Sequence, residues 1–167
     1  CALPISPREP WAYSRYAVSV YKFYAWLREN LLKYSVHTAE EAHKTGIPMM
    51  RPLPMVFPED KEAVYWEDEY FYGSDLLVAP VHQEGEKRRI YFPSGGWINL
   101  LDFRKMVGGN RIFQVDVPID KIPVYIREGA CILSVMNGEL QLGQSMTYEK
   151  KNTVLMSRAL NETSGKR

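Results

Sequence analysis

Cysteine is scarce in this sequence of 167 residues, which contains only Cys1 and Cys131. Two cysteines cannot form a disulfide framework, and their spacing matches no metal-binding pattern. Disulfide-rich secreted proteins are therefore excluded as a class. A reducing, cytoplasmic setting is the expectation that follows.

An excess of charge of one sign is also missing, because the formal net charge is +1. Binding to nucleic acid or to an anionic membrane surface would require clustered basic residues. The one basic run, Lys87-Arg88-Arg89, is short and is expected to be the solvated end of a strand. No signal peptide is recognisable, and the apolar runs are far shorter than the roughly 20 residues that span a bilayer. We expect neither a nucleic acid nor a membrane as partner.

The motifs of several enzyme classes are absent from the sequence. There is no glycine-rich phosphate loop, no His-Glu-x-x-His zinc motif and no Gly-x-Ser-x-Gly nucleophile elbow. His37 and His43 are six positions apart, which turns them away from each other on a helix. His43 next to Glu40 could orient a proton relay, but a histidine near the end of a helix more often complements the helix dipole. The sequence thus predicts no metal ion and no cofactor.

Paired carboxylates are present in two short runs, Glu59-Asp60 and Glu67-Asp68-Glu69. A retaining glycosidase needs two carboxyl groups roughly 5 to 5.5 Å apart, in environments different enough that one keeps its proton. Adjacent residues in a short acidic segment are expected to share one solvated environment and to point apart. We therefore predict no catalytic pair in this chain, and we interpret Asp60 as the cap of a helix that starts ahead of Glu62 and Ala63.

The front third of the chain predicts a loop followed by one long helix. The prolines in 1–11 favour extended or turning backbone. Between Ala12 and Lys44 apolar residues recur at steps of three and four, which predicts a helix with one buried face, and Gly46 is expected to end it. The members of that face are Tyr16, Val20, Phe23, Tyr24, Leu27, Leu31 and Tyr34. Tyr21 and Trp26 could form an aromatic platform for a sugar, but aromatic residues at helical spacing favour a place in the core.

The rest of the chain is typical of β structure. Pro48 to Val56 predicts a strand broken by prolines, and 76–81 is a continuous apolar strand. Further strands are predicted at 88–93, 97–101, 111–117, 124–127, 131–135 and 153–156. Short strands separated by glycine turns favour an antiparallel sandwich or barrel, with a boundary near Gly73 that separates it from the tail of an α/β domain. The predicted core of this β part is Leu77, Tyr91, Trp97, Ile112, Val124 and Ile132.

Seven motifs between Arg8 and Ala130 follow one another in the order seen in glycoside hydrolase family 31. They are Arg8-Glu9-Pro10-Trp11, the long amphipathic helix, Gly46 to Leu53, Phe57-Pro58-Glu59-Asp60, Tyr72 to Val81, Tyr91 to Trp97, and Ile122 to Ala130. On these residues the chain resembles this family, which includes α-glucosidases and α-xylosidases. The resemblance implies the end of a (β/α)8 TIM barrel in 1–73, followed by a proximal antiparallel β-sandwich in 74–167. It also implies that Pro48 to Val56 is the last barrel strand and that 63–72 is the last barrel helix.

The resemblance assigns no catalytic residue to this chain, because the family's aspartate nucleophile and aspartate acid/base would both precede Cys1. Arg8, Glu9 and Trp11 are the candidate substrate-binding residues, since the 1–11 loop follows a barrel strand at the face that carries active sites. Against this, Glu9 could simply pair with Arg8, and Trp11 could anchor the loop as a buried staple. Arg51 is expected to be paired structurally with a carboxylate from sequence that precedes the chain.

One departure from the family pattern concerns the long helix. The family often has proline before the tyrosine, where this chain has Lys33 before Tyr34. Because proline removes a helix hydrogen bond and lysine does not, we expect a less kinked helix here.

Two functions remain open from the sequence. The first is part of a retaining α-glycosidase that acts on an α-linked oligosaccharide, with the chain packed on the preceding barrel or associated with itself. The chain opens with Cys-Ala-Leu-Pro and not with methionine, which favours an internal piece of a longer polypeptide. The alternative is a non-catalytic β-sandwich module that binds carbohydrate or a protein partner. The apolar face of the long helix favours the first, since a free-standing module would have a polar helix surface.

Overall fold

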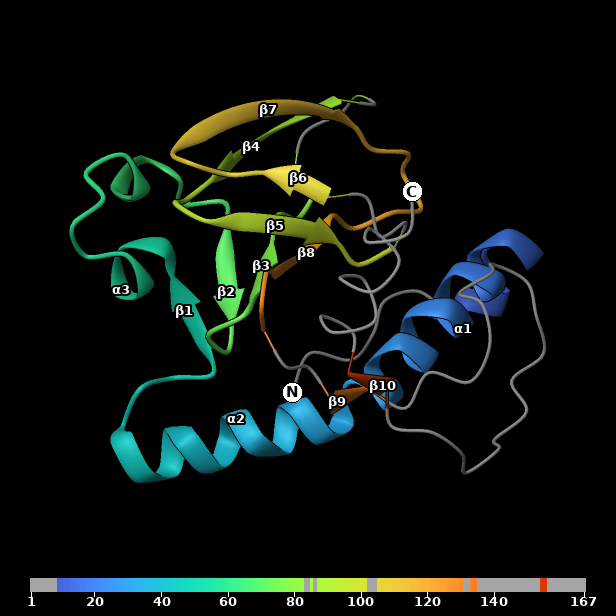
Figure 1. Cartoon of the computed structure of the whole chain (residues 1–167). Coiled ribbons are helices and arrows are strands. Elements are labelled where there is room, and N and C mark those ends of the chain that lie inside the picture. Colours follow the sequence, from blue (N-terminus) through green and yellow to red (C-terminus); the bar gives the residue numbers. More distant parts are fainter. Residues whose placement is uncertain are drawn as a thin grey trace, which may run out of the picture.

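Two helices pack against an antiparallel sheet in the computed structural model of the chain (Figure 1). The structure describes residues 9–82, 85, 87–101, 105–130, 133–134 and 154–155. The helical elements are η1 (Pro10–Ala12), α1 (Arg15–Asn30), α2 (Leu32–Thr45), α3 (Leu53–Val56) and η2 (Ala63–Tyr65). The strands are β1 (Met50–Pro52), β2 (Tyr70–Tyr72), β3 (Leu76–Val78), β4 (Lys87–Phe92), β5 (Gly96–Asn99), β6 (Lys105–Val107), β7 (Arg111–Asp116), β8 (Val124–Arg127), β9 (Leu133–Ser134) and β10 (Val154–Leu155).

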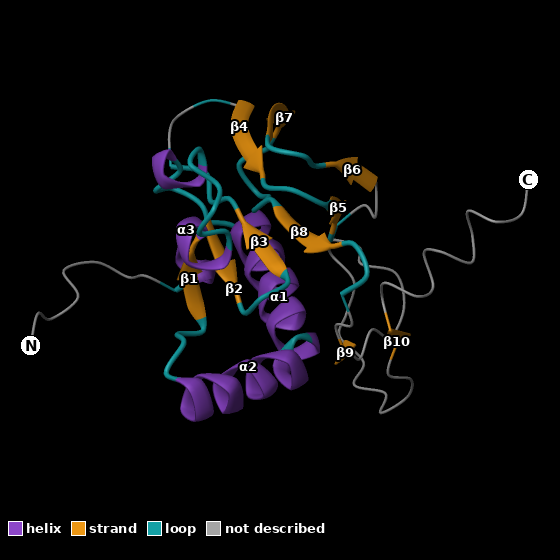
Figure 2. Ribbon diagram, turned by 60° about the vertical axis from the view of Figure 1, so that its left-hand side comes forward, coloured by secondary structure: helices purple, strands orange, loops and turns teal. Residues whose placement is uncertain are grey.

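The predicted single helix from Ala12 to Lys44 is wrong, because α1 and α2 separate at Leu31 and run in clearly different directions (Figure 2). Leu31 has φ −87° and ψ 4°, and its amide donates to the carbonyl oxygens of Leu27 and Glu29. The expectation of a less kinked helix is therefore also wrong: the break occurs although neither proline nor glycine is present. Ser14 caps the start of α1, and Gly46, in the left-handed conformation with φ +76°, ends α2 as predicted.

The strands form a six-stranded sheet in the order β1-β2-β3-β8-β5-β6, together with the pairs β4-β7 and β9-β10. Every ladder among the described residues is antiparallel, which confirms the predicted antiparallel β structure. Strands β1 and β2 come from before residue 74, yet they pair in the same sheet as β3, β8 and β5. The sheet thus continues across the expected boundary, and the division into 1–73 and 74–167 stays a prediction.

Two predicted elements between Pro48 and Tyr72 are wrong. The strand expected from Pro48 to Val56 shortens to β1 and continues as the helical turn α3, because Pro54 favours the first turn of a helix. The helix expected at 63–72 shortens to η2 and is followed by β2. In β2 the side chain of Phe71 is fully buried between Tyr70 and Tyr72, which is the alternation of a strand.

The core consists of two clusters on opposite faces of the six-stranded sheet. The helix side contains Leu27, Tyr34, Leu76, Val78, Leu100, Val124, Ile126 and Ala130. The other side, shared with β4 and α3, contains Leu53, Ala63, Phe71, Leu77, Ala79, Ile90, Tyr91, Phe92, Trp97 and Tyr125. Alternation along β3 explains this division, since Leu76 and Val78 face the helices and Leu77 faces the other side.

Most of the predicted β core is confirmed. Leu77, Tyr91, Trp97 and Val124 are buried. Ile112 is 42% exposed, so that prediction is wrong: it lies near the end of β7, whose one partner among the described residues is β4. Ile132 lies outside the described residues.

Tyr34 joins α2 to the turn between β2 and β3. Its hydroxyl donates to the carbonyl oxygen of Tyr72 at 2.9 Å and accepts from the amide of Asp75 at 3.2 Å. Gly73 lies directly beneath this hydroxyl with φ +67°, and a Cβ placed on it would overlap the Tyr34 ring and hydroxyl. The close approach of α2 to the sheet therefore requires glycine at this position.

We expect Gly73→Ala to lower the free energy of unfolding by about 3 kcal/mol, through left-handed backbone strain together with the overlap with Tyr34. The matched control is Gly46→Ala. Gly46 has φ +76° and no atom within 4 Å of an added Cβ, so strain alone should cost about 1 kcal/mol. Urea unfolding measures both. Equal losses of unfolding free energy in the two variants would show that Tyr34 of α2 is not in close contact with residue 73.

Candidate functional site

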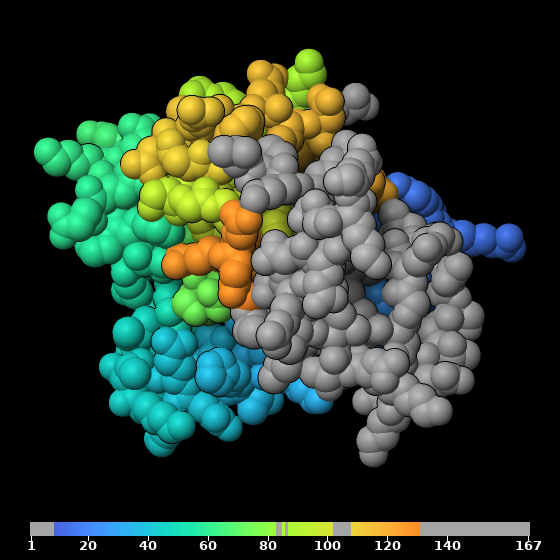
Figure 3. Space-filling view, in the orientation of Figure 1, coloured from blue at the N-terminus to red at the C-terminus, as the bar shows by residue number. Residues whose placement is uncertain are grey.

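The predicted substrate-binding residues lie at the N-terminal end of the helix pair. Arg8 lies outside the described residues, Glu9 is exposed at the start of η1, and Trp11 is 73% exposed. The interpretation of Trp11 as a buried staple is therefore wrong. Figure 3 shows this end of the chain, in blue, projecting from the right-hand edge of the molecule. The role of Arg8, Glu9 and Trp11 at the rim of an active site stays a prediction.

Aromatic side chains continue this exposed surface along α1. Tyr13, Tyr16 and Tyr21 are 67%, 57% and 59% exposed. The expectation that Tyr16 and Tyr21 belong to the core is wrong, because the buried side of α1 is restricted to its second half, where Leu27 and Asn30 are buried.

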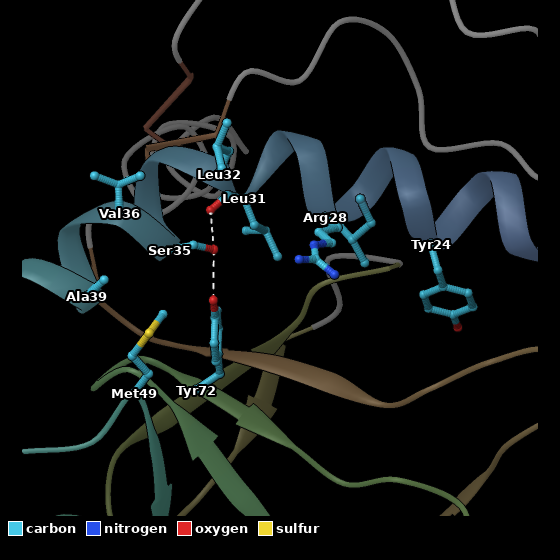
Figure 4. Close-up of a pocket in the computed structure, with 10 residues that line it drawn as sticks. Tyr24, Arg28, Leu31, Leu32, Ser35, Val36, Ala39, Met49 and Tyr72 are labelled. Carbon is cyan, nitrogen blue, oxygen red and sulfur yellow. Dashed lines mark hydrogen bonds between the residues drawn. The ribbon is translucent and has the colours of Figure 1, made fainter. Parts of the chain in front are cut away.

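An open groove of about 640 Å³ runs between the helices and the sheet (Figure 4). It is lined by Tyr24, Leu27, Arg28, Leu31, Leu32, Ser35, Val36, Ala39, Met49 and Tyr72. The α1 and α2 residues form one wall, and Met49 and Tyr72 stand opposite them. Most of the lining is aliphatic, so the groove is suited to apolar contact.

The polar groups of this groove are mostly occupied. The Tyr72 hydroxyl donates to Ser35 Oγ at 2.8 Å, and Ser35 Oγ donates to the carbonyl oxygen of Leu31 at 3.0 Å (Figure 4). Tyr24 donates to the carbonyl oxygen of Asp120 and accepts from the amide of Ile122. Arg28 reaches toward the groove, and no hydrogen bond or ion pair joins it to a residue in the part of the chain that the structure describes. The groove therefore offers a surface for binding and holds no nucleophile paired with a base.

The acidic run before β2 forms a second polar cluster with β4. Arg88 Nη1 donates to Asp68 Oδ2 at 2.8 Å, and Arg88 Nη2 donates to the Asp68 carbonyl oxygen at 3.0 Å. Arg88 is 7% exposed, so the prediction that Lys87-Arg88-Arg89 is a solvated strand end is wrong at its central residue. Burial opposes the ionisation of Asp68, but the hydrogen bond and the charge of Arg88 outweigh it and hold the pKa of Asp68 below its usual value.

Glu69 is 2% exposed and lies beneath this pair. Its Oε1 accepts from the amide of Tyr91 at 3.0 Å and lies 4.0 Å from Arg88 Nη2, and its Oε2 has no hydrogen-bond partner among the described residues. Burial raises the pKa of Glu69 to about 8, against the smaller lowering effects of the Tyr91 amide and of Arg88. The expectation that these acids share one solvated environment is wrong. Yet Glu69 is enclosed, so a sugar cannot reach it, and the cluster links β2 to β4.

Two further polar residues differ from their predicted roles. Arg51 Nη2 pairs with Glu41 Oε2 at 2.7 Å, so its carboxylate partner comes from α2 of the same chain and not from preceding sequence. Asp60 Oδ1 accepts from the amide of Glu62, but η2 has Glu62 at its N-cap position and no side-chain cap, so the prediction that Asp60 caps a helix is wrong. Asp60 Oδ2 also accepts the Tyr91 hydroxyl at 2.6 Å.

Neither a metal site nor a membrane-spanning helix is found within the described ranges. No group of three or more histidine, cysteine, aspartate or glutamate side chains among these residues could hold a metal ion. No helix among them is long and apolar enough to cross a bilayer.

Comparison with known proteins identifies the family of this chain. The model of the glycosyl hydrolase family 31 C-terminal domain matches residues 46–132. An α-glucosidase 2 of Bacillus thermoamyloliquefaciens is 32% identical over 133 residues, which are 79% of this chain and 17% of the relative. An α-xylosidase of Saccharolobus solfataricus is 33% identical over 130 residues, 77% of this chain and 18% of the relative.

Solved structures agree with this result. The crystal structure of a family 31 α-xylosidase from a soil metagenome, complexed with xylose, has a TM-score of 0.72 and 38% identity, and the match covers 76% of this chain and 19% of that one. The chain belongs to glycoside hydrolase family 31, as its sequence motifs predicted. It spans less than a fifth of the length of these relatives.

Proposed function

We propose that this chain is the C-terminal portion of a retaining, α-glucosidase-like glycosidase that hydrolyses O-glycosyl bonds of α-linked oligosaccharides. The observation that carries the proposal is the family match over 46–132 together with glycosidase relatives, whose names include an α-glucosidase and α-xylosidases. The two catalytic carboxylates would lie in sequence that precedes residue 1. In this arrangement 1–73 completes a (β/α)8 barrel, and the β-sandwich that follows supports it.

Four carboxylates among the described residues support the proposal that catalysis depends on other residues. Asp68 pairs with Arg88, Glu69 is enclosed, Glu41 pairs with Arg51, and Asp60 accepts two hydrogen bonds. A retaining mechanism needs one accessible acid and one accessible nucleophile on either side of the glycosidic bond. These four residues instead make contacts that hold strands and turns together.

The 167-residue chain alone should therefore show no turnover of p-nitrophenyl α-glucoside or p-nitrophenyl α-xyloside above the buffer background. Release of p-nitrophenol is measured at enzyme concentrations high enough to detect a rate 10⁴-fold below an ordinary kcat of about 10 s⁻¹. Turnover that disappears in Asp68→Asn or Glu69→Gln would contradict the proposal. A chain that is inactive but binds maltose would favour the alternative, a non-catalytic carbohydrate-binding module.

The surface of α1 is expected to be covered in the parent enzyme. Trp11, Tyr16 and Tyr21 are exposed on one helical arm, and β1 has no second strand neighbour among the described residues. Exposed apolar surface and an open strand edge favour association. We infer that this face packs on the preceding part of the barrel or, in the isolated chain, on a second copy.

The isolated chain should accordingly self-associate at tens of micromolar, because these apolar side chains are exposed to water. Static light scattering gives the mass directly. Changing Trp11 and Tyr21 to serine should shift the scattering mass toward that of the monomer, and the control Tyr65→Ser, on an exposed side chain of η2, should not. A stable monomer with 12–53 protected from hydrogen exchange would contradict the inference and favour a free-standing module.

A further inference from the structure

His82, in the segment that leaves β3, lies between the side chains of Asp68 and Arg88. His82 Nδ1 is 2.9 Å from Arg88 Nη1, and His82 Nε2 is 3.3 Å from Asp68 Oδ2. Arg88 Nη1 is itself 2.8 Å from the same Asp68 oxygen. The three side chains thus form a closed triangle that joins the segment before β2, the segment after β3 and the start of β4.

The contact with Arg88 determines where the proton of His82 resides. A guanidinium nitrogen can only donate, so His82 Nδ1 must accept, and an accepting ring nitrogen carries no proton. The contact therefore fits a neutral imidazole with its proton on Nε2, the ring nitrogen that faces Asp68 Oδ2.

A second proton on His82 would break this arrangement. It would place an N–H on Nδ1 directly against an N–H of Arg88, at a separation that suits a hydrogen bond, and it would set two cations against one carboxylate oxygen. The side chain of His82 is 43% exposed and that of Arg88 is 6% exposed. Because the His82 side chain is in contact with water and the Arg88 side chain is not, the protonated His82 side chain is the one expected to move out of the triangle into solvent.

Arg88 keeps enough partners to stay in place. It retains its hydrogen bonds to Asp68 Oδ2 and to the Asp68 carbonyl oxygen. Glu69 lies 4.0 Å from Arg88 Nη2 and is neutral in acid, because burial raises its pKa to about 8. Of the other charged residues nearby that the structure describes, Lys87 stands opposite Asp116 in the register of β4 and β7, Arg89 lies over the ring of Trp66, and Glu67 is exposed.

We propose that His82, Asp68 and Arg88 form a proton-controlled latch, which holds the segment after β3 against β4 while His82 is neutral and releases it when His82 is protonated. Acid that protonates the His82 ring would therefore open the latch. This inference concerns the fold itself and does not depend on the proposed glycosidase activity.

The first test determines the tautomer of His82. Long-range ¹H–¹⁵N correlation spectra of the full 167-residue chain at about pH 8 should place the ring proton on Nε2 and should show a nuclear Overhauser contact between the His82 ring and the Arg88 side chain. A proton on Nδ1 would overturn the proposal, since Arg88 could not then be its donor.

The second test follows the latch with pH. The test uses the Glu69→Gln background, because Glu69 lies 4.0 Å from Arg88 Nη2 and its pKa of about 8 would otherwise shift the Arg88 resonances with pH. In this background the His82–Arg88 contact should be lost at about pH 5, and the Arg88 guanidinium resonances should shift together with those of the His82 ring. Adding His82→Gln should abolish this shift, while adding the control His43→Gln, at an exposed histidine of α2, should leave it. A contact that survives at about pH 5, or an Arg88 shift that survives in His82→Gln, would overturn the proposal. Retention of the Tyr91 amide signal in each variant confirms that β4 is folded.

Discussion

Trp97→Ala should lower the free energy of unfolding of this chain by about 4 kcal/mol. The Trp97 side chain is fully buried, and its ring lies 5.7 Å from that of Phe71 and 6.4 Å from that of Phe92. Its Nε1 donates to the carbonyl oxygen of Pro93 at 3.0 Å. The substitution therefore leaves a large cavity between the two layers of the β part and removes one of the two hydrogen bonds to the Pro93 carbonyl, which also accepts from the amide of Gly109.

Urea unfolding followed by far-ultraviolet circular dichroism measures this loss without relying on tryptophan fluorescence. Trp11→Ala is the matched control, because Trp11 is 73% exposed and should change stability by less than about 0.5 kcal/mol. Trp97→Phe keeps part of the packing and provides a folded variant if Trp97→Ala does not fold. A loss below about 1 kcal/mol for Trp97→Ala would show that the core is centred elsewhere.

Stability should fall as the pH rises from about 4.5 to about 8, because of Glu69. Its pKa is raised from 4.5 to about 8 in the folded chain. The neutral carboxyl group of the folded state is thus fully favourable below about pH 4.5, and this contribution is lost as the pH rises through 8. At about 1.4 kcal/mol for each pH unit, the total amounts to about 5 kcal/mol.

Glu69→Gln should remove most of this slope and should be more stable than the original chain at pH values above 8, since glutamine is neutral at every pH. Glu67→Gln is the control, because Glu67 is exposed and should leave the slope unchanged. Free energies of unfolding, measured in urea at several pH values, test the predicted change in slope. A slope that is the same in Glu69→Gln and in the original chain would show that Glu69 is ionised in the fold.

The β part could be predicted from the sequence because its signals are local. Alternating side chains and glycine turns predicted 88–93, 111–117 and 124–127, and β4, β7 and β8 lie at these places within a residue of each end. The motifs that predicted the family are likewise short runs around turns. Each of these motifs can be recognised without knowing which residues pack against it.

The helix break and the burial of Glu69 could not be predicted, because neither has a local signal in the sequence. No proline or glycine lies near Leu31, whose carbonyl oxygen accepts a hydrogen bond from the Ser35 hydroxyl, which in turn accepts one from the Tyr72 hydroxyl of β2. Glu69 is buried because Tyr91 and Arg88 of β4, about twenty positions away, cover it. A run of three acids is solvated by default, and the last acid of this run is buried only because β4 lies over it.

Neither the groove nor the partner of Arg51 could be predicted from the sequence. Arg51 and Glu41 belong to different elements, and their contact depends on the direction of α2 after the break. An arginine in an otherwise apolar strand was the available signal, and it predicted a carboxylate partner without revealing which one. The groove arises between α1, α2 and β2, so no single segment carries its pattern.

The measurement that tests the account most directly is the anomeric configuration of the sugar first released from an α-glucoside, followed by ¹H NMR in two samples. One sample contains the longer polypeptide that includes this chain, and the other contains the 167 residues alone. A retaining enzyme with both carboxylates outside the chain should release the α-anomer first in the former sample and nothing in the latter. Release of the β-anomer first, or of any sugar by the 167 residues alone, would contradict the account.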